Sequence, residues 1–211
     1  MSLSYLKDPE AIYAASFATI GEEVDFSSLP EDLIAVATRL IHACGMIDVI
    51  DALSYSADVA KAVNTALVDE APIVVDCEMV RAGIISRFLS HNNEIICTLN
   101  RKNVPELARA SATTRSAAAV DLWQPFLAGA IVVIGNAPTA LFRLLELLEQ
   151  GGPKPAAILG FPVGFVGAVE SKAALAVNSY DVPFICVQGR RGGSAMASGA
   201  FNAFALEAAA V

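Results

Sequence analysis

Five short apolar segments, each followed by a stretch of helical periodicity, occupy the second two-thirds of the chain. The apolar segments are rich in Ile and Val and are bounded by Gly, Pro, Asn or Asp, which is the pattern of buried strands. They cover residues 72–77, 94–99, 129–136, 156–161 and 183–189. The helical patterns cover residues 79–89, 104–123, 138–150, 167–178 and 194–208. Regular alternation of strand and helix predicts a parallel sheet with helices on both faces.

The first 70 residues have a different pattern. Helix-like stretches occur near residues 8–16, 30–44 and 51–68, and no convincing long strand interrupts them. We see no internal repeat, linker or low-complexity tract that would divide the chain. We therefore predict one domain over residues 1–211, with an α/β fold of three layers (α/β/α), a parallel sheet of about five strands and a mainly helical N-terminal region.

The composition is 55% hydrophobic and 17% charged, which is apolar even for a globular protein. A membrane protein would explain this, but no window of 18 or more residues is free of charges and turn formers. The N-terminus also lacks the apolar core of a signal peptide. Strands that are buried on both faces of a parallel sheet explain the excess better, and an oligomer interface would add to it.

The net charge and the cysteine spacing argue against two kinds of ligand, nucleic acid and a metal ion held by Cys and His. The net charge of −8 argues against a nucleic-acid binder, which needs a basic surface, although a few arginines could still hold an anionic ligand. The cysteines lie far apart in apolar contexts, and no Cys/His spacing suits a metal site. We interpret Cys44, Cys77, Cys97 and Cys186 as reduced, mostly buried thiols of a cytoplasmic protein.

The segment RLIHACGM, residues 39–46, contains one of the two histidines of the chain. On a helix over residues 31–46 the apolar side chains share one face, and Arg39 and His42 fall together on the opposite side. His42 is therefore either a solvated surface histidine or half of a cationic pair that faces a ligand. Histidine suits proton delivery because its reference pKa lies near neutral pH. The other histidine, His91, lies in a polar loop, and we expect it to be dispensable.

In a parallel sheet, ligands bind at the carboxyl ends of the strands, so the loops there are the places to search. QGRRGGS, residues 188–194, is a glycine-rich turn in which Arg190, Arg191 and a helix N-terminus could bind an anion. Ser194 could cap the helix that follows. The alternative is a tight turn with solvated arginines. Arg115, in TTRS before an alanine-rich helix, has the same two interpretations.

Two more loops, GNAPTAL and GFPVGFVGAVESK, contain glycine but match neither GxGxxG nor GxxxxGK[ST], so they support a nucleotide site only weakly. The stretch that would hold a ribose acid reads TLNRKN. Asp76 and Glu78 end the first predicted strand and should point to one side. Paired carboxylates can do acid–base work or hold a metal, but without further ligands they more often accept local hydrogen bonds.

Together these segments resemble a known family. RLIHACGM, DCEMVRAGI, TTRSAAAVDLW, GNAPTALF, GFPVGFVGAVESK and QGRRGGSAMA closely resemble, in order, the motifs of precorrin-8X methylmutase, the precorrin isomerase of cobalamin biosynthesis. The resemblance runs from YLKDPEAIYAASF to the C-terminal helix. It implies a flavodoxin-like parallel sheet and a homodimer with sites near the dimer interface.

The resemblance also implies a reaction. A methyl group migrates from C11 to C12 of precorrin-8X, or of cobalt-precorrin-8, to give hydrogenobyrinic acid or cobyrinic acid, without a cofactor. His42 matches the family's catalytic histidine and would be the proton donor. Ser16 and Arg39 match substrate-contacting positions. The arginines, which include Arg115, Arg190 and Arg191, would pair with the acetate and propionate groups of the tetrapyrrole.

Two alternatives remain open from the sequence alone. A non-catalytic carrier of a late corrinoid would need the arginines but not a proton from His42. A nucleotide-binding enzyme would need a phosphate loop and a ribose acid, which the sequence lacks. Direct transfer of substrate from the preceding enzyme of the pathway would suit an acidic protein with an anionic substrate, so adjacent pathway enzymes are candidate partners.

Overall fold

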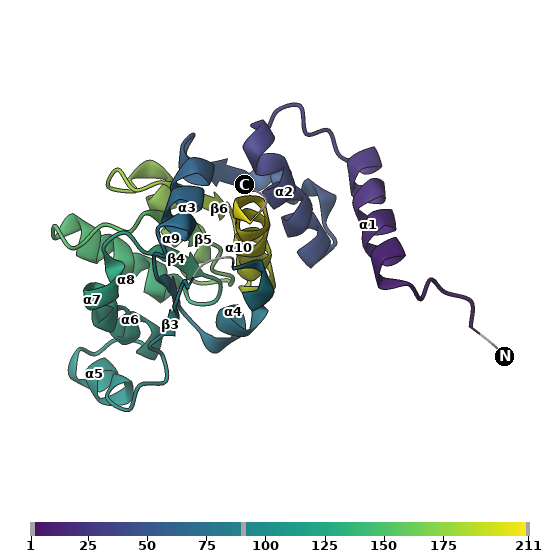
Figure 1. Cartoon of the computed structure of the whole chain (residues 1–211). Coiled ribbons are helices and arrows are strands. Elements are labelled where there is room, and N and C mark those ends of the chain that lie inside the picture. The colour runs from purple at the N-terminus through teal and green to yellow at the C-terminus, as the bar shows by residue number, and fades with distance from the viewer. Residues whose placement is uncertain (1–2, 90–91, 210–211) are drawn as a thin grey trace.

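The centre of the computed structural model is a mixed sheet, which within the described residues, 3–89 and 92–209, has six strands (Figure 1). The strands are β1 (Leu53–Tyr55), β2 (Ile73–Val75), β3 (Ile95–Cys97), β4 (Ile131–Ile134), β5 (Ala157–Gly160) and β6 (Phe184–Val187). Their order in the sheet is β1-β6-β5-β4-β2-β3. Strands β2 to β6 pair in parallel, and β1 pairs antiparallel with β6.

The five strands expected from the apolar segments are all present, as β2 to β6. Numbered among themselves, these parallel strands have the order 2-1-3-4-5, which is the strand order of flavodoxin-like sheets. The chain order reverses between β2 and β4, so the carboxyl ends of these two strands mark the switch point of the sheet.

The prediction of a helix over residues 51–68 was wrong in its first half, and the sheet has a sixth strand as a result. The 3₁₀-helix η1 (Ile47–Ala52) leads into β1, and the helix α3 (Val59–Val68) begins after it. Strand β1 is three residues long, too short for a period of two to be visible in the sequence. Its hydrogen bonds to the edge of β6 determine its conformation, so tertiary pairing overrides local preference.

The predicted helices at 138–150, 167–178 and 194–208 are confirmed, whereas those at 79–89 and 104–123 are broken into shorter pieces. Two features divide the second of these: Ala112 has a positive φ of 48°, and the Thr114 side chain then caps a new helix by accepting from the Ala117 N–H. Besides η1 and α3, the helices are α1 (Pro9–Glu23), α2 (Glu31–Cys44), α4 (Glu78–Gly83), η2 (Ser86–Phe88), α5 (Val104–Ala110), α6 (Arg115–Val120), η3 (Asp121–Trp123), α7 (Gln124–Leu127), α8 (Pro138–Glu149), α9 (Ala168–Val177) and α10 (Ser194–Ala208).

Alternate residues of the strands face two separate cores, as three layers require. Val75, Val133 and Leu159 pack with helices α2, α3, α4 and α10 on one face of the sheet. Val74, Val132 and other alternate positions pack with α8, α9 and the segment around Trp123 on the other face. Because both faces are covered, the strands need apolar residues at every position, which accounts for the unusually apolar composition.

Helix α1 projects from this body and contacts α2 (Figure 1). It begins at Asp8, whose side chain accepts from the Ala11 N–H, and Pro9 occupies the first helical position. Ile20 is its buried residue, although the helix is apolar on all sides. No helix among residues 3–89 and 92–209 is long and apolar enough to cross a membrane.

Candidate active site

Helix α2 places Arg39 and His42 on the side away from its core face. The buried residues of this helix are Leu33, Val36, Ala37, Leu40 and Ile41, and they lie against α10 and the rest of one core. Gly45 ends the helix in a left-handed conformation with φ of 68°, so the chain turns away directly after the histidine. Arg39 is half-buried and His42 is exposed, as expected for residues outside the core face.

Three side chains of α1 surround the imidazole of His42. The Oγ atom of Ser16 lies 2.9 Å from Nδ1 of His42, close enough for a hydrogen bond. The ring of Tyr13 stacks on the imidazole with centroids 5.5 Å apart, and Phe17 meets it edge-on at 5.4 Å. In the described part of the chain, Nε2 has no hydrogen-bond partner, so this nitrogen is available to a ligand.

Arg39 is a partly desolvated cation. Its guanidinium lies over the rings of Phe17, at 5.6 Å, and Phe88, at 5.8 Å. Burial lowers the pKa of Arg39, but a guanidinium remains charged at physiological pH. It forms no ion pair within the described residues. A half-buried cation that lacks a carboxylate partner favours an anionic ligand.

Two adjoining cavities lie beside this group at the carboxyl side of the sheet. The first, of about 410 Å³, is lined by Tyr13, Arg39, His42, Ala43, Met79, Gly83, Ile85, Ser194, Ala195, Ser198, Gly199 and Asn202. The second, of about 510 Å³, is lined by Ala43, Cys44, Met46, Val163, Gly164, Phe165, Arg190, Arg191, Gly192, Ala195 and Met196. Ala43 and Ala195 line both, so the two cavities adjoin where α2 and α10 meet. We call the two together the α2–α10 cleft.

Arg190 and Arg191 line the far half of this cleft. The exposed guanidinium of Arg190 stacks over the Phe165 ring at 5.3 Å, and it has no ion-pair partner in the part of the chain described. Arg191 donates to Asp48 at 2.8 Å and so joins the turn to η1. The expected cap by Ser194 is absent: Gly193, with φ of 125°, precedes the helix, and Ser194 Oγ lies 3.5 Å from the Sγ of Cys77.

The comparisons with known proteins agree on one family. The family model of precorrin-8X methylmutase matches residues 11–207. The chain is 53% identical to the precorrin-8X methylmutase of Pseudomonas aeruginosa over 205 residues, which is 97% of this chain and 99% of that protein. The chain belongs to the precorrin-8X methylmutase family. It is also 34% identical to the cobalt-precorrin-8 methylmutase of Priestia megaterium, over 94% of this chain and 88% of that one.

A solved structure supports the fold of this methylmutase family member. The precorrin-8X methylmutase of Thermus thermophilus superimposes with a TM-score of 0.86 at 36% identity, over 95% of this chain and 97% of that chain. The family relation makes the protein an isomerase. The resemblance inferred from the sequence motifs is therefore confirmed, while the roles of individual residues remain predictions.

Arg115 lies outside the α2–α10 cleft. It is exposed at the start of α6 and donates to the Leu99 carbonyl at 3.3 Å and to Oδ1 of Asn100 at 3.2 Å. It lines neither cavity of the cleft. Within one chain of this methylmutase, Arg115 braces the loop after β3.

Asp76 does not form a reactive pair with Glu78. Its carboxylate is 3% exposed and accepts hydrogen bonds at 2.9 Å from the N–H groups of Gly135, Asn136 and Ala137. Burial raises the pKa of Asp76, and these three donors oppose that shift. Glu78 is exposed and faces Arg81 at 3.8 Å. The N–H groups of Gly135, Asn136 and Ala137 are therefore occupied by a carboxylate of the protein and are not free to bind a substrate.

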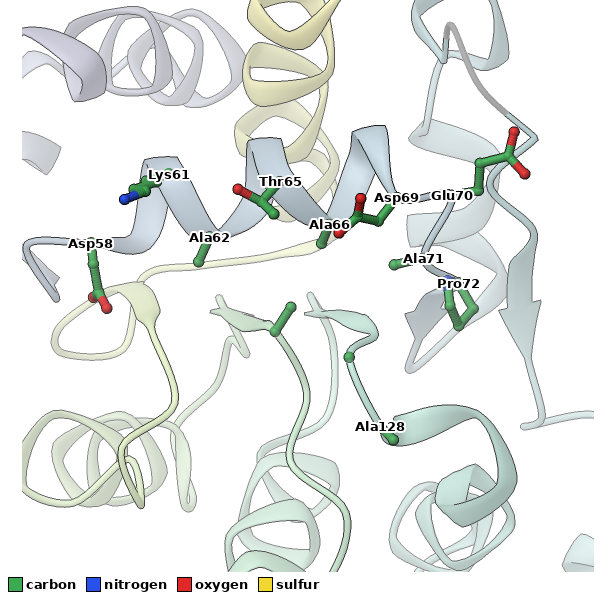
Figure 2. A pocket seen from close by; sticks show the side chains of 12 residues that line it. Asp58, Lys61, Ala62, Thr65, Ala66, Asp69, Glu70, Ala71, Pro72 and Ala128 are labelled. Carbon is green, nitrogen blue, oxygen red and sulfur yellow. The ribbon is translucent and has the colours of Figure 1, made fainter.

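A further cavity lies at the opposite edge of the sheet. It measures about 780 Å³ and is formed by α3 and the residues that precede β2, β4 and β5 (Figure 2). Its charged groups are Asp58, Asp69 and Glu70 with the single cation Lys61. This acidic lining opposes an anionic ligand, so we do not assign it to the methylmutase reaction. Over the described parts of the chain, no group of three or more His, Cys, Asp and Glu residues could hold a metal ion.

Sequence reasoning missed Tyr13 and Phe17. Both lie on α1. Tyr13 is three residues before Ser16 and four residues before Phe17, so the three side chains share a helix face. That spacing is visible in AIYAASF, but nothing in the sequence indicates that this face meets α2. His91 lies outside the described residues, so its expected position in a loop is not tested.

Proposed function

We propose that this chain catalyses the C11-to-C12 methyl migration of precorrin-8X, with His42 as the proton donor. The observation that carries the proposal is the position of His42 between α1 and the α2–α10 cleft. Its Nδ1 atom is held by Ser16, and its Nε2 atom is available to the ligand. A general acid needs this arrangement, because one ring nitrogen must be oriented while the other reaches the reacting group.

The migration is a formal [1,5]-sigmatropic shift, so it involves no net change of redox state. Protonation or hydrogen bonding of a ring position by His42 withdraws electrons from the macrocycle and favours movement of the methyl group to C12. The proton returns to His42 when the rearranged product forms. Histidine can carry out both transfers near neutral pH.

The cations along the cleft would hold the carboxylate groups of the substrate. Arg39 lies at the His42 end, and Arg190 and Arg191 lie at the other. Guanidinium groups bind carboxylates through two parallel hydrogen bonds, which fixes orientation as well as affinity. Ser16 keeps the imidazole in place rather than binding a carboxylate. Arg115 could reach a substrate only from a second subunit.

The substrate we propose is the metal-free one. The Pseudomonas aeruginosa relative, named for precorrin-8X, is 53% identical to this chain, whereas the Priestia megaterium relative, named for cobalt-precorrin-8, is 34% identical. We also propose that residues 1–211 form a single domain. We propose too that the protein works in the cytoplasm, where adjacent enzymes of the pathway could transfer the substrate.

A homodimer is part of the proposal. Helix α1 and the residues before it expose a run of large apolar side chains, Leu3, Tyr5, Leu6, Ile12 and Tyr13. Because α1 also carries the groups that hold His42, a second copy packed on it would stabilise the site. We expect a particle of twice the 22.0 kDa chain mass by light scattering, and a monomer at micromolar concentration would contradict this.

The direct test is incubation of the purified protein with precorrin-8X, followed by absorption spectroscopy for hydrogenobyrinic acid. An enzyme gives many equivalents of product, whereas a carrier retains the substrate and gives none. The same assay with cobalt-precorrin-8 should give a lower kcat/KM. A higher kcat/KM with the cobalt compound would contradict the proposed substrate but not the reaction.

A further inference from the structure

Lys172 is a fully buried lysine on α9, in the segment GFPVGFVGAVESK. Its exposed fraction is 0%, which is rare for a lysine unless the amine has a specific partner. That partner is the backbone carbonyl of Arg191, which accepts a hydrogen bond from Nζ. The reaction proposed above does not use this amine.

The carbonyl that Lys172 binds belongs to the arginine turn of the α2–α10 cleft. The turn is also held on its other side, because the Gly164 N–H donates to the Arg190 carbonyl at 3.2 Å. The Gly193 N–H donates to the Phe161 carbonyl at 2.8 Å. The carbonyls of both arginines are therefore bound inside the protein, which leaves their side chains at the cleft.

The packing around the turn leaves little room for an alternative arrangement. A Cβ atom at Gly192 would lie 2.4 Å from the Phe161 carbonyl oxygen and 2.6 Å from that of Pro162. The two loops thus pack backbone against backbone, and position 192 has no room for a side chain. Lys172 reaches the Arg191 carbonyl from α9, the helix that follows the loop of Phe161 and Pro162.

We propose that Lys172 is a positioning residue for substrate binding: its buried amine fixes the turn that presents Arg190 and Arg191 to the substrate carboxylates. Lys172 does not touch the substrate. The inference rests on the proposed function, because it requires that these arginines bind the tetrapyrrole. It predicts an effect on affinity with little effect on the chemical step.

The ionisation of the amine gives a second readout. Burial lowers the pKa of Lys172 to about 8. Burial raises the pKa of the Cys186 thiol, on β6, to about 12, so this thiol stays neutral up to pH 9.5. Gln188, which contacts both the Lys172 carbonyl and Cys186, does not ionise. Lys172 is thus cationic below pH 8 and neutral above it, and a neutral donor forms the weaker hydrogen bond.

The test is Lys172→Met, which keeps a long unbranched side chain without the amine. We expect Kd for hydrogenobyrinic acid and KM for precorrin-8X to rise about tenfold at pH 7, the factor that corresponds to 1.4 kcal/mol. We expect kcat to stay within about threefold, because His42 is unaffected. The melting temperature should change little, because the lost hydrogen bond to the Arg191 carbonyl is offset by removal of the desolvation cost of a buried amine. Lys154→Met, at an exposed ion pair with Asp181, is the matched control and should leave Kd unchanged.

A pH series separates positioning from packing. The ratio of the Kd values of Lys172→Met and wild type should shrink between pH 7 and 9.5, because the wild-type amine loses its proton in this range. If Lys172→Met does not fold, the Kd of the wild-type protein is measured alone. This Kd must rise between pH 7 and 9.5, and a constant Kd would overturn the proposal. A folded Lys172→Met protein with a Kd within twofold of wild type would overturn it as well.

Arg190→Ala, measured in parallel, tells the two failures apart. If Arg190→Ala weakens product binding and Lys172→Met does not, the positioning role is wrong while the proposed site stands. If neither substitution changes Kd, the arginine turn is not part of the substrate site. Arg190 and Arg191 would then no longer count among the substrate-binding residues of the proposed function.

Discussion

The loops after β4 and after β6 have similar local structures, but the first binds a carboxylate of the protein and the second lines a cavity. Each leaves the carboxyl end of a central strand, contains glycine and enters a helix, α8 or α10. After β4, three successive N–H groups bind the buried Asp76 carboxylate. After β6, the carbonyls of Arg190 and Arg191 are bound inside, and their side chains line a cavity.

The difference shows that a glycine-containing turn at a helix N-terminus is not by itself a ligand site. In open parallel α/β sheets the switch point, which lies here between β2 and β4, is the usual place for a ligand. Here the protein's own carboxylate fills that place, and the cleft with the available cations lies to one side, between α2 and α10. Each of the following substitutions tests one side of this comparison.

The largest expected effect is that of His42→Asn, in the α2–α10 cleft. Asn keeps a hydrogen-bond donor of similar reach but cannot deliver a proton at neutral pH. Turnover of precorrin-8X should fall by about 10²–10⁴-fold, the usual contribution of a positioned acid–base group. Affinity for the product should be retained, because the arginines supply most of it. If affinity fell in step with kcat, His42 would only position the macrocycle.

Asp76→Ala should give the largest loss of stability. It leaves three N–H groups at the start of α8 without their acceptor, and we expect the free energy of unfolding to fall by about 3 kcal/mol in urea titrations. The control is Glu78→Ala, which removes an exposed carboxylate two residues away and should change this free energy by less than about 0.5 kcal/mol. A stable Asp76→Ala protein with weak product binding would reverse the comparison, since the β4 loop would then be the functional one.

Arg190→Ala should weaken product binding by about 1.5–3 kcal/mol, the range for a hydrogen bond to a charged group. The free energy of unfolding should hardly change, because the side chain is exposed and forms no ion pair among the described residues. Isothermal titration calorimetry and urea unfolding measure the two quantities. A loss of stability with unchanged affinity would mean that the turn after β6, like the loop after β4, serves the fold and not the ligand.

The smallest effect is expected for Arg115→Ala, which tests how far the site extends along the carboxyl edge of the sheet. Its guanidinium donates to Leu99 and Asn100 outside the cleft, so product affinity should change by no more than about twofold, or about 0.4 kcal/mol. An effect as large as that of Arg190→Ala would mean that Arg115 reaches the substrate of a second subunit.

Much of the fold could be predicted from the sequence, because strands buried on both faces are apolar throughout. The pattern that predicts β2, β4, β5 and β6 is a direct consequence of full burial, whereas β3, at the edge of the sheet, is half-buried at its first and last residues. The pattern of α2 likewise separates Arg39 and His42 from the core. Strand β1 could not be predicted, since three half-buried residues carry no periodicity and depend on the edge of β6.

The sequence suggests candidate site residues but not the contacts between them. Ser16 and His42 are 26 residues apart, and only the packing of α1 on α2 brings them together. Asp76 is likewise about 60 residues from the N–H groups that it binds, so its structural role is invisible in DCEM. The motif TTRS indicates a helix start at Arg115, but it does not show that the side chain binds Leu99 and Asn100 outside the cleft.

A crystal structure with bound hydrogenobyrinic acid would test the account most directly, because it locates the ligand among three candidate places. The account predicts the macrocycle in the α2–α10 cleft, with Nε2 of His42 within hydrogen-bond distance of the ring and Arg190 paired with a side-chain carboxylate. A macrocycle bound against the GNAPT loop, or in the cavity beneath α3 (Figure 2), would contradict it.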